Sequence, residues 1–282
     1  MANNLPIIFM ASHMFESTPT NNQQSEDTSL ASFLSSEETN SSNLSSSQWK
    51  LLRLHCKTGH QHFAKLQQLI RNRLGTCDPP ICKSCIYGKQ HQCAIPSDSS
   101  ALDTSHLSPG DCIFGDQVKS TTPGLVPTYK GTPTSQRYHT GTPFVDHAIR
   151  YLHFTPHFST GCQESLLAKH NVEMHASHHN ISIKCYHTKN GIFSSKDFRN
   201  SCTQQHQQIK FCGVNTHHQN AIAEQYICSI TECAHTMLIH ALISWPDTIS
   251  EQLWPYALQL ATDLHNDTPW SIWASSARDF YR

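Results

Sequence analysis

Two stretches of the sequence decide the fold: His187-Thr188-Lys189-Asn190-Gly191-Ile192-Phe193 and Asn215-Thr216-His217-His218-Gln219-Asn220-Ala221-Ile222-Ala223-Glu224. The first follows an apolar run at 182–186 that is typical of a short strand, and a helix is expected after it at 195–204. The second begins a long helix expected at 221–245, where apolar residues recur at helical spacing. Both stretches therefore lie where a turn or loop meets a regular element.

Upstream and downstream of these stretches, short apolar runs alternate with turns from Asp111 onward. The other expected elements are strands at 113–118, 143–145, 150–158 and 209–212 and helices at 164–175 and 252–266. Strands come first and helices are interleaved afterwards. This order predicts an α/β domain with a central mixed sheet.

The N-terminal part of the chain has a different composition. Residues 13–48 are rich in Ser, Thr, Asn, Gln and Glu, so they cannot bury enough apolar area to offset their ordering entropy. Helical apolar spacing starts at Trp49 and recurs at 63–70. The expected organisation is a disordered segment, a small helical module, a linker, a core domain and a tail, at 1–48, 49–96, 97–110, 111–270 and 271–282.

Within the helical module, His55-x4-His60 and Cys82-x2-Cys85 form a set of two histidines and two cysteines. Zinc takes four nitrogen or sulfur ligands, and a closed set of four is structural rather than catalytic. A module of under 50 residues has a small core, so metal binding would supply much of its folding energy. Other thiols are close in sequence and could compete as ligands, although we expect them to be bystanders: Cys56, Cys77 and Cys93.

The cysteine count, the apolar runs and the net charge limit the cellular compartment in which the protein is expected. The chain has 12 cysteines and no secretory signal, because the apolar run at 5–11 is short and no basic residue precedes it. No run is expected to approach the roughly 18 residues of a membrane span. Metal ligation or burial of the thiols, in a nuclear or cytoplasmic setting, is therefore favoured over disulfides. The formal net charge is −1, without the overall basic excess that nucleic-acid-binding proteins usually show.

Taken in order, the motifs resemble the integrases of copia-type retrotransposons. The two opening stretches resemble their Asp-Asn-Gly and Gln-Asn-Gly-x-Ala-Glu runs, and His55, His60, Cys82 and Cys85 resemble the GAG-pre-integrase zinc module. Further segments also match the pattern: LSPGDCIFGDQV at 107–118, TPGL at 122–125, FVDH at 144–147 and LWPYAL at 253–258. The resemblance extends over roughly Trp49 to Pro269. It implies a ribonuclease-H-like core, DNA as partner, possible self-association and no membrane.

The resemblance also implies a catalytic site in which three carboxylates hold two Mg²⁺ or Mn²⁺ ions. Asp116 matches the first carboxylate and Glu224 the third, but Lys189 replaces the second. A protonated amine cannot ligate a metal, and the exchange changes the site by two charge units. We expect metal affinity and strand transfer to be lost, and Lys189 to form a salt bridge with Asp116 or Glu224.

Other residues are weaker candidates for the missing ligand. Asp146 is expected at a turn and Asp197 in the first turn of a helix, while Asn190 offers only a neutral oxygen. His217, His218 and Gln219 lie in the loop that shapes the site in relatives.

Three functions are compatible with this sequence. The first is a degenerate integrase from a DNA-integrating element, which we expect to be truncated at its C-terminus. The second is a non-enzymatic module that binds nucleic acid or protein and keeps the integrase fold. The third, an active nuclease with an unrecognised metal site, is the least favoured.

Overall fold

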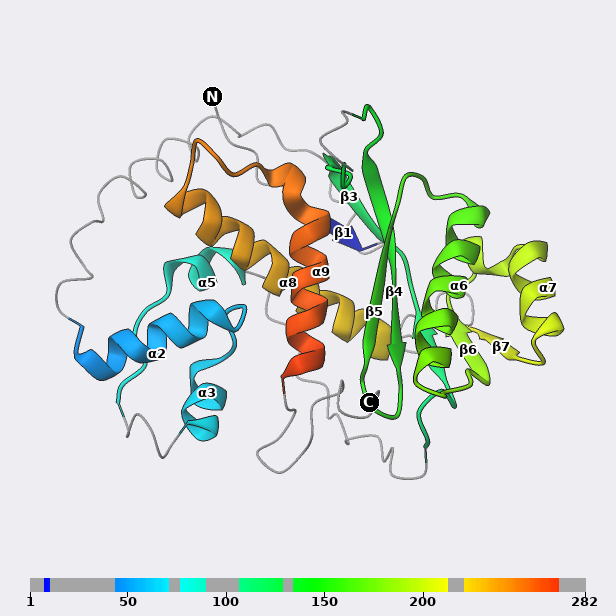
Figure 1. Ribbon diagram of the computed structural model, residues 1–282, viewed down its shortest axis with the longest axis horizontal. Coiled ribbons are helices and arrows are strands. Elements are labelled where there is room, and N and C mark those ends of the chain that lie inside the picture. Colours follow the sequence, from blue (N-terminus) through cyan, green and yellow to red (C-terminus); the bar gives the residue numbers. More distant parts are fainter. Residues whose placement is uncertain are drawn as a thin grey trace, which may run out of the picture.

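The structure is a computed structural model that describes residues 8–10, 44–70, 77–89, 107–128, 134–212 and 221–268. Figure 1 shows the short helices of residues 46–88 at one end, the sheet with the helices of residues 162–204 at the other end, and the long helix α8 (Ala221–Ser244) running between them. The described part of the chain therefore has a helical module next to an α/β core.

Two consecutive strands form the centre of the sheet. Both β2 (Ile113–Gly115) and β3 (Val118–Gly124) pair antiparallel with β4 (Tyr138–Asp146). The single strand expected at 113–118 is thus interrupted at Asp116 and Gln117 and then continues beyond the expected end. This interruption places the Asp116 side chain at a break in the ladder.

The remaining strands complete a mixed sheet. β5 (Leu152–His157) pairs antiparallel with β4, β6 (Cys185–Thr188) runs parallel to β2, and β7 (Gln208–Phe211) runs parallel to β6. The spatial order across the core is β7, β6, β2, β4, β5. In chain order, three antiparallel strands come first and two parallel strands follow. This is the ribonuclease-H-like arrangement, so the fold class expected from the sequence is confirmed.

Helices cover both faces of this sheet (Figure 1). On one face, α6 (Cys162–His178) and α7 (Lys196–Gln204) enclose a core that includes Phe144, Tyr186 and Phe198. On the other face, α8 (Ala221–Ser244) and α9 (Trp254–Asp267) enclose a second core. Short 3-10 turns precede α7 and α9, at Ile192–Ser194 (η3) and Glu251–Leu253 (η5). These bounds agree closely with the expected helices.

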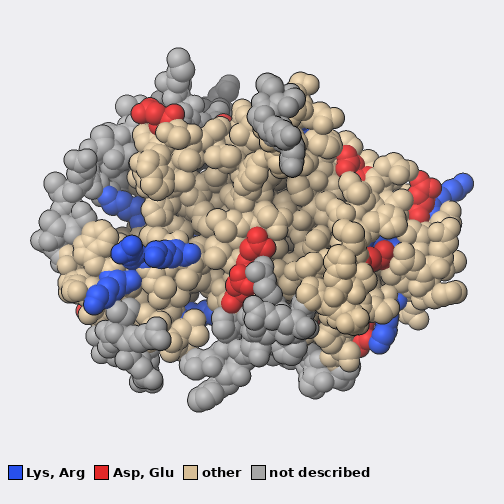
Figure 2. Space-filling view, in the orientation of Figure 1, with Lys and Arg blue, Asp and Glu red and all other residues tan. Residues whose placement is uncertain are grey.

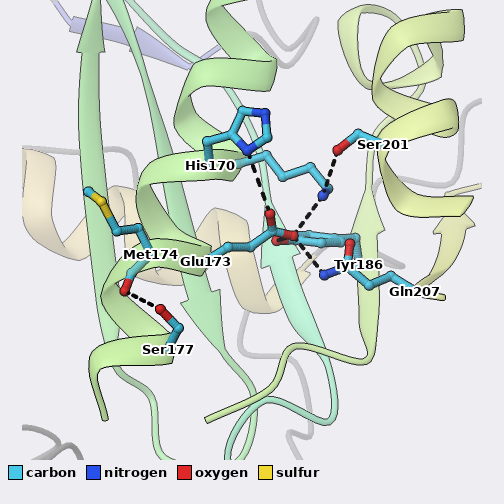
Figure 3. Close-up of polar contacts among 8 residues, drawn as sticks. His170, Glu173, Met174, Ser177, Tyr186, Ser201 and Gln207 are labelled. Carbon is cyan, nitrogen blue, oxygen red and sulfur yellow. Dashed lines mark hydrogen bonds and ion pairs between the residues drawn. The ribbon is translucent and has the colours of Figure 1, made fainter. Parts of the chain in front are cut away.

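The first face also contains a buried polar network between α6, β6 and α7 (Figure 3). Lys169 is fully buried, with its Nζ 2.6 Å from Glu173 Oε1 and 3.0 Å from Ser201 Oγ. The same Glu173 oxygen accepts hydrogen bonds from Tyr186 Oη at 3.0 Å and from Gln207 Nε2 at 2.7 Å. Buried charges need such pairing, so this network fixes how α6 and α7 sit on the sheet.

The helical module consists of α2 (Ser46–Lys57), α3 (Phe63–Leu69) and α5 (Lys83–Gly88). A capping box between Ser45 and Gln48 begins α2, because each side chain bonds to the other's backbone N–H. The module packs against α8 so closely that a Cβ on Gly88 would lie 2.7 Å from the Thr236 Cα. Only glycine fits at this contact.

The structure describes only part of the segments expected to be a disordered N-terminus and a linker. Ile8–Met10 forms β1, which pairs antiparallel with β3, within the segment 1–48 for which the composition predicts disorder. The rest of that segment up to residue 43 and most of the linker at 97–110 lie outside the described residues.

One described helix bears on the expectation that no segment could span a membrane. Within the described ranges, Ile222–Ser244 of α8 is long and apolar enough to do so, by length and composition alone. Polar residues interrupt the apolar run of this helix, so the sequence pattern alone does not indicate a span. Its Ala223, Ile227 and Ile230 are buried in the core on this face of the sheet.

Candidate functional site

Three charged side chains meet where β2 and β6 end. Asp116 lies at the break between β2 and β3, Lys189 follows β6 directly, and Glu224 lies in the first turn of α8. Because β2 and β6 are parallel neighbours with Gly115 opposite Thr188, the residues that follow each of them emerge side by side. The fold thus brings together three residues that are far apart in the sequence.

The Lys189 ammonium lies between the two carboxylates. Its Nζ is 2.9 Å from Asp116 Oδ2 and 2.7 Å from Glu224 Oε1. The Asp116 side chain is 4% exposed, whereas those of Lys189 and Glu224 are 20% and 25% exposed. The expected salt bridge is therefore present, and Lys189 pairs with both acids rather than one. We refer to these three residues as the charged triad.

Burial and pairing act in opposite directions within the charged triad. Burial raises the pKa of Asp116, and the contacts with Lys189 only partly offset this effect. Burial acts to lower the pKa of Lys189, but its contacts with Glu224 and Asp116 outweigh burial, so that this pKa is raised. Lys189 therefore stays protonated at neutral pH.

This arrangement does not fit the Mg²⁺ or Mn²⁺ that the resemblance implies. Both ions prefer oxygen ligands, and here an ammonium occupies the space between the two available carboxylates. The formal charge of the charged triad is −1, whereas three carboxylates would give −3. The charged triad therefore lacks the ligands for metal-dependent chemistry.

The alternative ligands have other partners. The Asp146 carboxylate accepts hydrogen bonds from the backbone N–H groups of Gly110, Ala148 and Ile149. Asp197, in the first turn of α7, accepts a hydrogen bond from Gln163. The Asn190 amide donates to the Cys212 carbonyl oxygen. Each has a structural role, and the loop residues His217, His218 and Gln219 lie outside the described part of the chain.

The four sequence-predicted zinc ligands converge in the helical module. The ligand atoms of His55, His60, Cys82 and Cys85 all lie within 4.8 Å of one another. The Cys85 Sγ is 3.2 Å from His55 Nε2 and 3.5 Å from His60 Nδ1, and the two imidazole nitrogens are 3.1 Å apart. Both histidines are buried. We refer to these residues as the His/Cys cluster.

These spacings fit a tetrahedral zinc ion. With Zn–N near 2.0 Å and Zn–S near 2.3 Å, a tetrahedron has edges of about 3.3 Å between nitrogens and about 3.5 Å between nitrogen and sulfur. The His55 Nδ1 lies 2.7 Å from the Gln61 carbonyl oxygen, which fixes the tautomer that leaves Nε2 for a metal. The residues of the cluster therefore fit a zinc ion, which they could hold through two nitrogens and two sulfurs.

Thiols around the cluster differ in environment. The hydrogen bond between the Cys82 and Cys85 side chains is the main reason that the pKa of Cys82 is lowered. The same bond raises the pKa of Cys85. Burial raises the pKa of Cys56 to about 11, and this residue forms a second group with His60 and His240. Cys77 lies beside Gln67 instead, while Cys93 is outside the described residues.

Basic residues concentrate in the helical module, which the overall charge conceals. Residues 49–89 contain eight Lys or Arg against one acidic residue, Asp78. Lys50, Arg53 and Lys57 are exposed on one face of α2, a helix that has no acidic residue. Figure 2 shows basic side chains gathered over this end of the molecule. Counting charge by segment would have revealed this basic face from the sequence.

No protein-family model matches the sequence, and no curated protein matches it. Among solved structures, the chain is similar to one from the simian T-cell lymphotropic virus intasome in complex with PP2A regulatory subunit B56 gamma, with 16% identity and a TM-score of 0.46. The match covers 62% of this chain and 55% of that one, so the chain spans about half of its length.

Two isolated catalytic cores are also similar. The HTLV-2 integrase catalytic core domain in complex with magnesium has 17% identity and a TM-score of 0.43, over 62% of this chain and 99% of that chain. The BIV integrase catalytic core domain has 13% identity and a TM-score of 0.41, over 61% and 93%.

Proposed function

We propose that this chain is a copia-type integrase derivative that binds nucleic acid but no longer performs DNA integration, because Lys189 occupies the place of the catalytic metals. The observation that carries the proposal is the position of its ammonium between Asp116 and Glu224. These two acids are the proposed remnants of the catalytic set.

Charge supports the loss of chemistry. Two unit charges about 4 Å apart interact by about 4 kcal/mol at an effective dielectric near 20. Replacing a carboxylate by an ammonium turns one attraction for a divalent ion into a repulsion, so the change amounts to several kcal/mol. Two-metal phosphodiester cleavage needs both ions. The wild-type site is accordingly proposed to be inactive.

The helical module is proposed to be a GAG-pre-integrase-like zinc module, with structural zinc held by the His/Cys cluster. The observation behind it is the convergence of four ligand atoms within 4.8 Å of one another, with the His55–His60 and His55–Cys85 distances near the edges of a zinc tetrahedron. The boundaries proposed for the module and the core are those expected from the sequence, at 49–96 and 111–270. Self-association is also proposed, on the resemblance alone, and a nuclear or cytoplasmic location is proposed on the cysteine usage.

Retention of nucleic-acid binding without catalysis is favoured by the basic face of α2. Lys and Arg side chains neutralise phosphates and release counterions, which supplies most non-specific affinity for DNA. Three exposed basic residues along one helix face, in a segment with a single acid, form such a surface. A role as a binding module is therefore the second candidate function, and it requires no metal at the charged triad.

The test compares the wild type with Lys189→Asp in a Mg²⁺- or Mn²⁺-dependent nicking and strand-transfer assay on DNA that carries a retroelement end. Lys184→Asp is the matched control, because Lys184 pairs with Asp111 at the exposed surface. We expect no activity in the wild type or control and measurable nicking in Lys189→Asp. Metal-dependent activity of the wild type would contradict the proposal, and silence of Lys189→Asp would favour the binding-module function.

A further inference from the structure

We propose that His240, on helix α8 of the core, positions the zinc ligand His60, so that metal binding and docking of the helical module on the core are coupled. The inference rests on the proposed zinc site and adds to it a residue that lies 180 positions from its hydrogen-bond partner. His240 is proposed as an outer contact of the metal site rather than as a fifth ligand.

The His60 ring is shared between the cluster and the core. Its Nδ1 faces the other ligands, 3.1 Å from His55 Nε2 and 3.4 Å from Cys82 Sγ. Its Nε2 points the opposite way and lies 3.0 Å from His240 Nδ1. When a metal takes Nδ1, the proton stays on Nε2 and is donated to His240. Ligating histidines almost always make such a second hydrogen bond, which fixes the ring and strengthens it as a ligand.

The same face of α8 supports the rest of the cluster. Cys233 lies two helical turns before His240, and its Sγ is 3.0 Å from the carbonyl oxygen of Gly59, the residue before His60. Thr236, between them on the same face, meets Gly88 at the end of α5, the helix that contains Cys85. One stripe of α8 therefore touches both the histidine half and the cysteine half of the cluster.

The backbone at this contact leaves little freedom. Gly59 and His60 have φ values of 68° and 59°, and His60 is the less tolerant of this left-handed conformation because it has a Cβ. The Lys89 ammonium donates to the His60 carbonyl oxygen at 2.8 Å. Contacts from α8 and from the end of α5 thus hold His60 in a conformation that directs one nitrogen to the cluster and the other to the core.

The coupling has a measurable size. Loss of an outer contact of a zinc ligand typically weakens metal affinity about 10- to 100-fold. Linkage is reciprocal, so removal of the metal should weaken docking of the module on α8 by the same factor. His240 also belongs to a three-residue group with Cys56 and His60 that could hold a metal directly. The closed set of four ligands favours the outer role and predicts one zinc per chain.

The experiment measures zinc stoichiometry and affinity for the full chain by competition with a chromophoric chelator. Variants are His240→Ala, His240→Gln, whose amide oxygen can still accept the proton of His60, and the control His178→Ala at an exposed position on α6. We expect one zinc per wild-type chain, a 10- to 100-fold loss in His240→Ala, partial recovery in His240→Gln and no change in the control. Hydrogen exchange at residues 233–240 of the wild type should accelerate when zinc is chelated.

The outcomes separate the inference from the zinc site itself. Tight binding of one zinc by the wild type, with unchanged affinity in His240→Ala, would overturn the role of His240 and leave the zinc site intact. Two zinc ions per wild-type chain would also overturn it, because His240 would then be a direct ligand. Exchange at 233–240 that ignores chelation would reject the coupling. A wild type that binds no zinc would refute both proposals.

Discussion

Replacing Lys189 by methionine should destabilise the protein by leaving two acids without their cation. The Lys189 Nζ is within 3 Å of both carboxylates, and the Asp116 side chain is only 4% exposed. Removing one partner of a buried pair costs about 3–5 kcal/mol. Because Glu224 and Lys189 keep some solvent contact, screening reduces the figure, and we expect about 2–3 kcal/mol at pH 7.

The pH dependence of this loss has a defined sign. Burial already raises the pKa of Asp116, and without the ammonium it should rise further. The cost of Lys189→Met is therefore present at neutral pH and shrinks as the pH falls and Asp116 becomes protonated. Urea unfolding of wild type and variant between pH 4 and pH 7 measures the difference directly.

Two controls distinguish this effect from general loss of a lysine. Lys184→Met removes an ion pair whose lysine is 67% exposed, and it should change the unfolding free energy by less than about 1 kcal/mol. Adding Asp116→Asn to Lys189→Met removes the uncompensated charge and should recover much of the lost stability. The reasoning would be refuted if Lys189→Met were as stable as the wild type, or if its loss of unfolding free energy were the same at every pH from 4 to 7.

Three further predictions concern other parts of the molecule. Lys169→Met leaves the largely buried Glu173 without its cation and should cost about 3–5 kcal/mol in urea unfolding; a loss below about 1 kcal/mol would show that the network adds little. Burial lowers the pKa values of His153 and His157 to about 4, so stability should be full above pH 6.5 and fall progressively towards pH 4. His157→Gln should flatten that fall, and an unchanged pH profile would contradict this. Replacing the basic face of α2 by alanine at Lys50, Arg53 and Lys57 should reduce the steepness with which log K for DNA falls with log salt concentration by about 2–3. An unchanged steepness would mean that DNA binds elsewhere.

Local patterns were sufficient for most of the fold. The apolar runs and helical spacing predicted α6 to α9 with small errors at their ends. They failed where the burial pattern was not local. The first half of β4 contains Thr140 and Thr142, which are fully buried although their residue type does not indicate a core strand. Strand β4 therefore begins five residues earlier than expected.

The candidate site shows the same division. The motifs located Asp116, Lys189, Glu224 and the four residues of the His/Cys cluster, because each lies in a distinctive run of sequence. His240 could not be found in this way, because it is one of 21 histidines and its importance arises only from the packing of α8 on the module. Lys169 was missed for a similar reason, since a lysine within a helix pattern is normally solvent-exposed.

The most direct test of the account is the affinity for Mn²⁺, measured by titration calorimetry on the wild type and on Lys189→Asp at the same pH and ionic strength. If the Lys189 ammonium replaces the catalytic metals, the wild type should bind no Mn²⁺ at the charged triad, and Lys189→Asp should gain at least one site that is lost again in a Lys189→Asp/Asp116→Asn double variant. Wild-type Mn²⁺ binding that is abolished by Asp116→Asn would contradict the central claim.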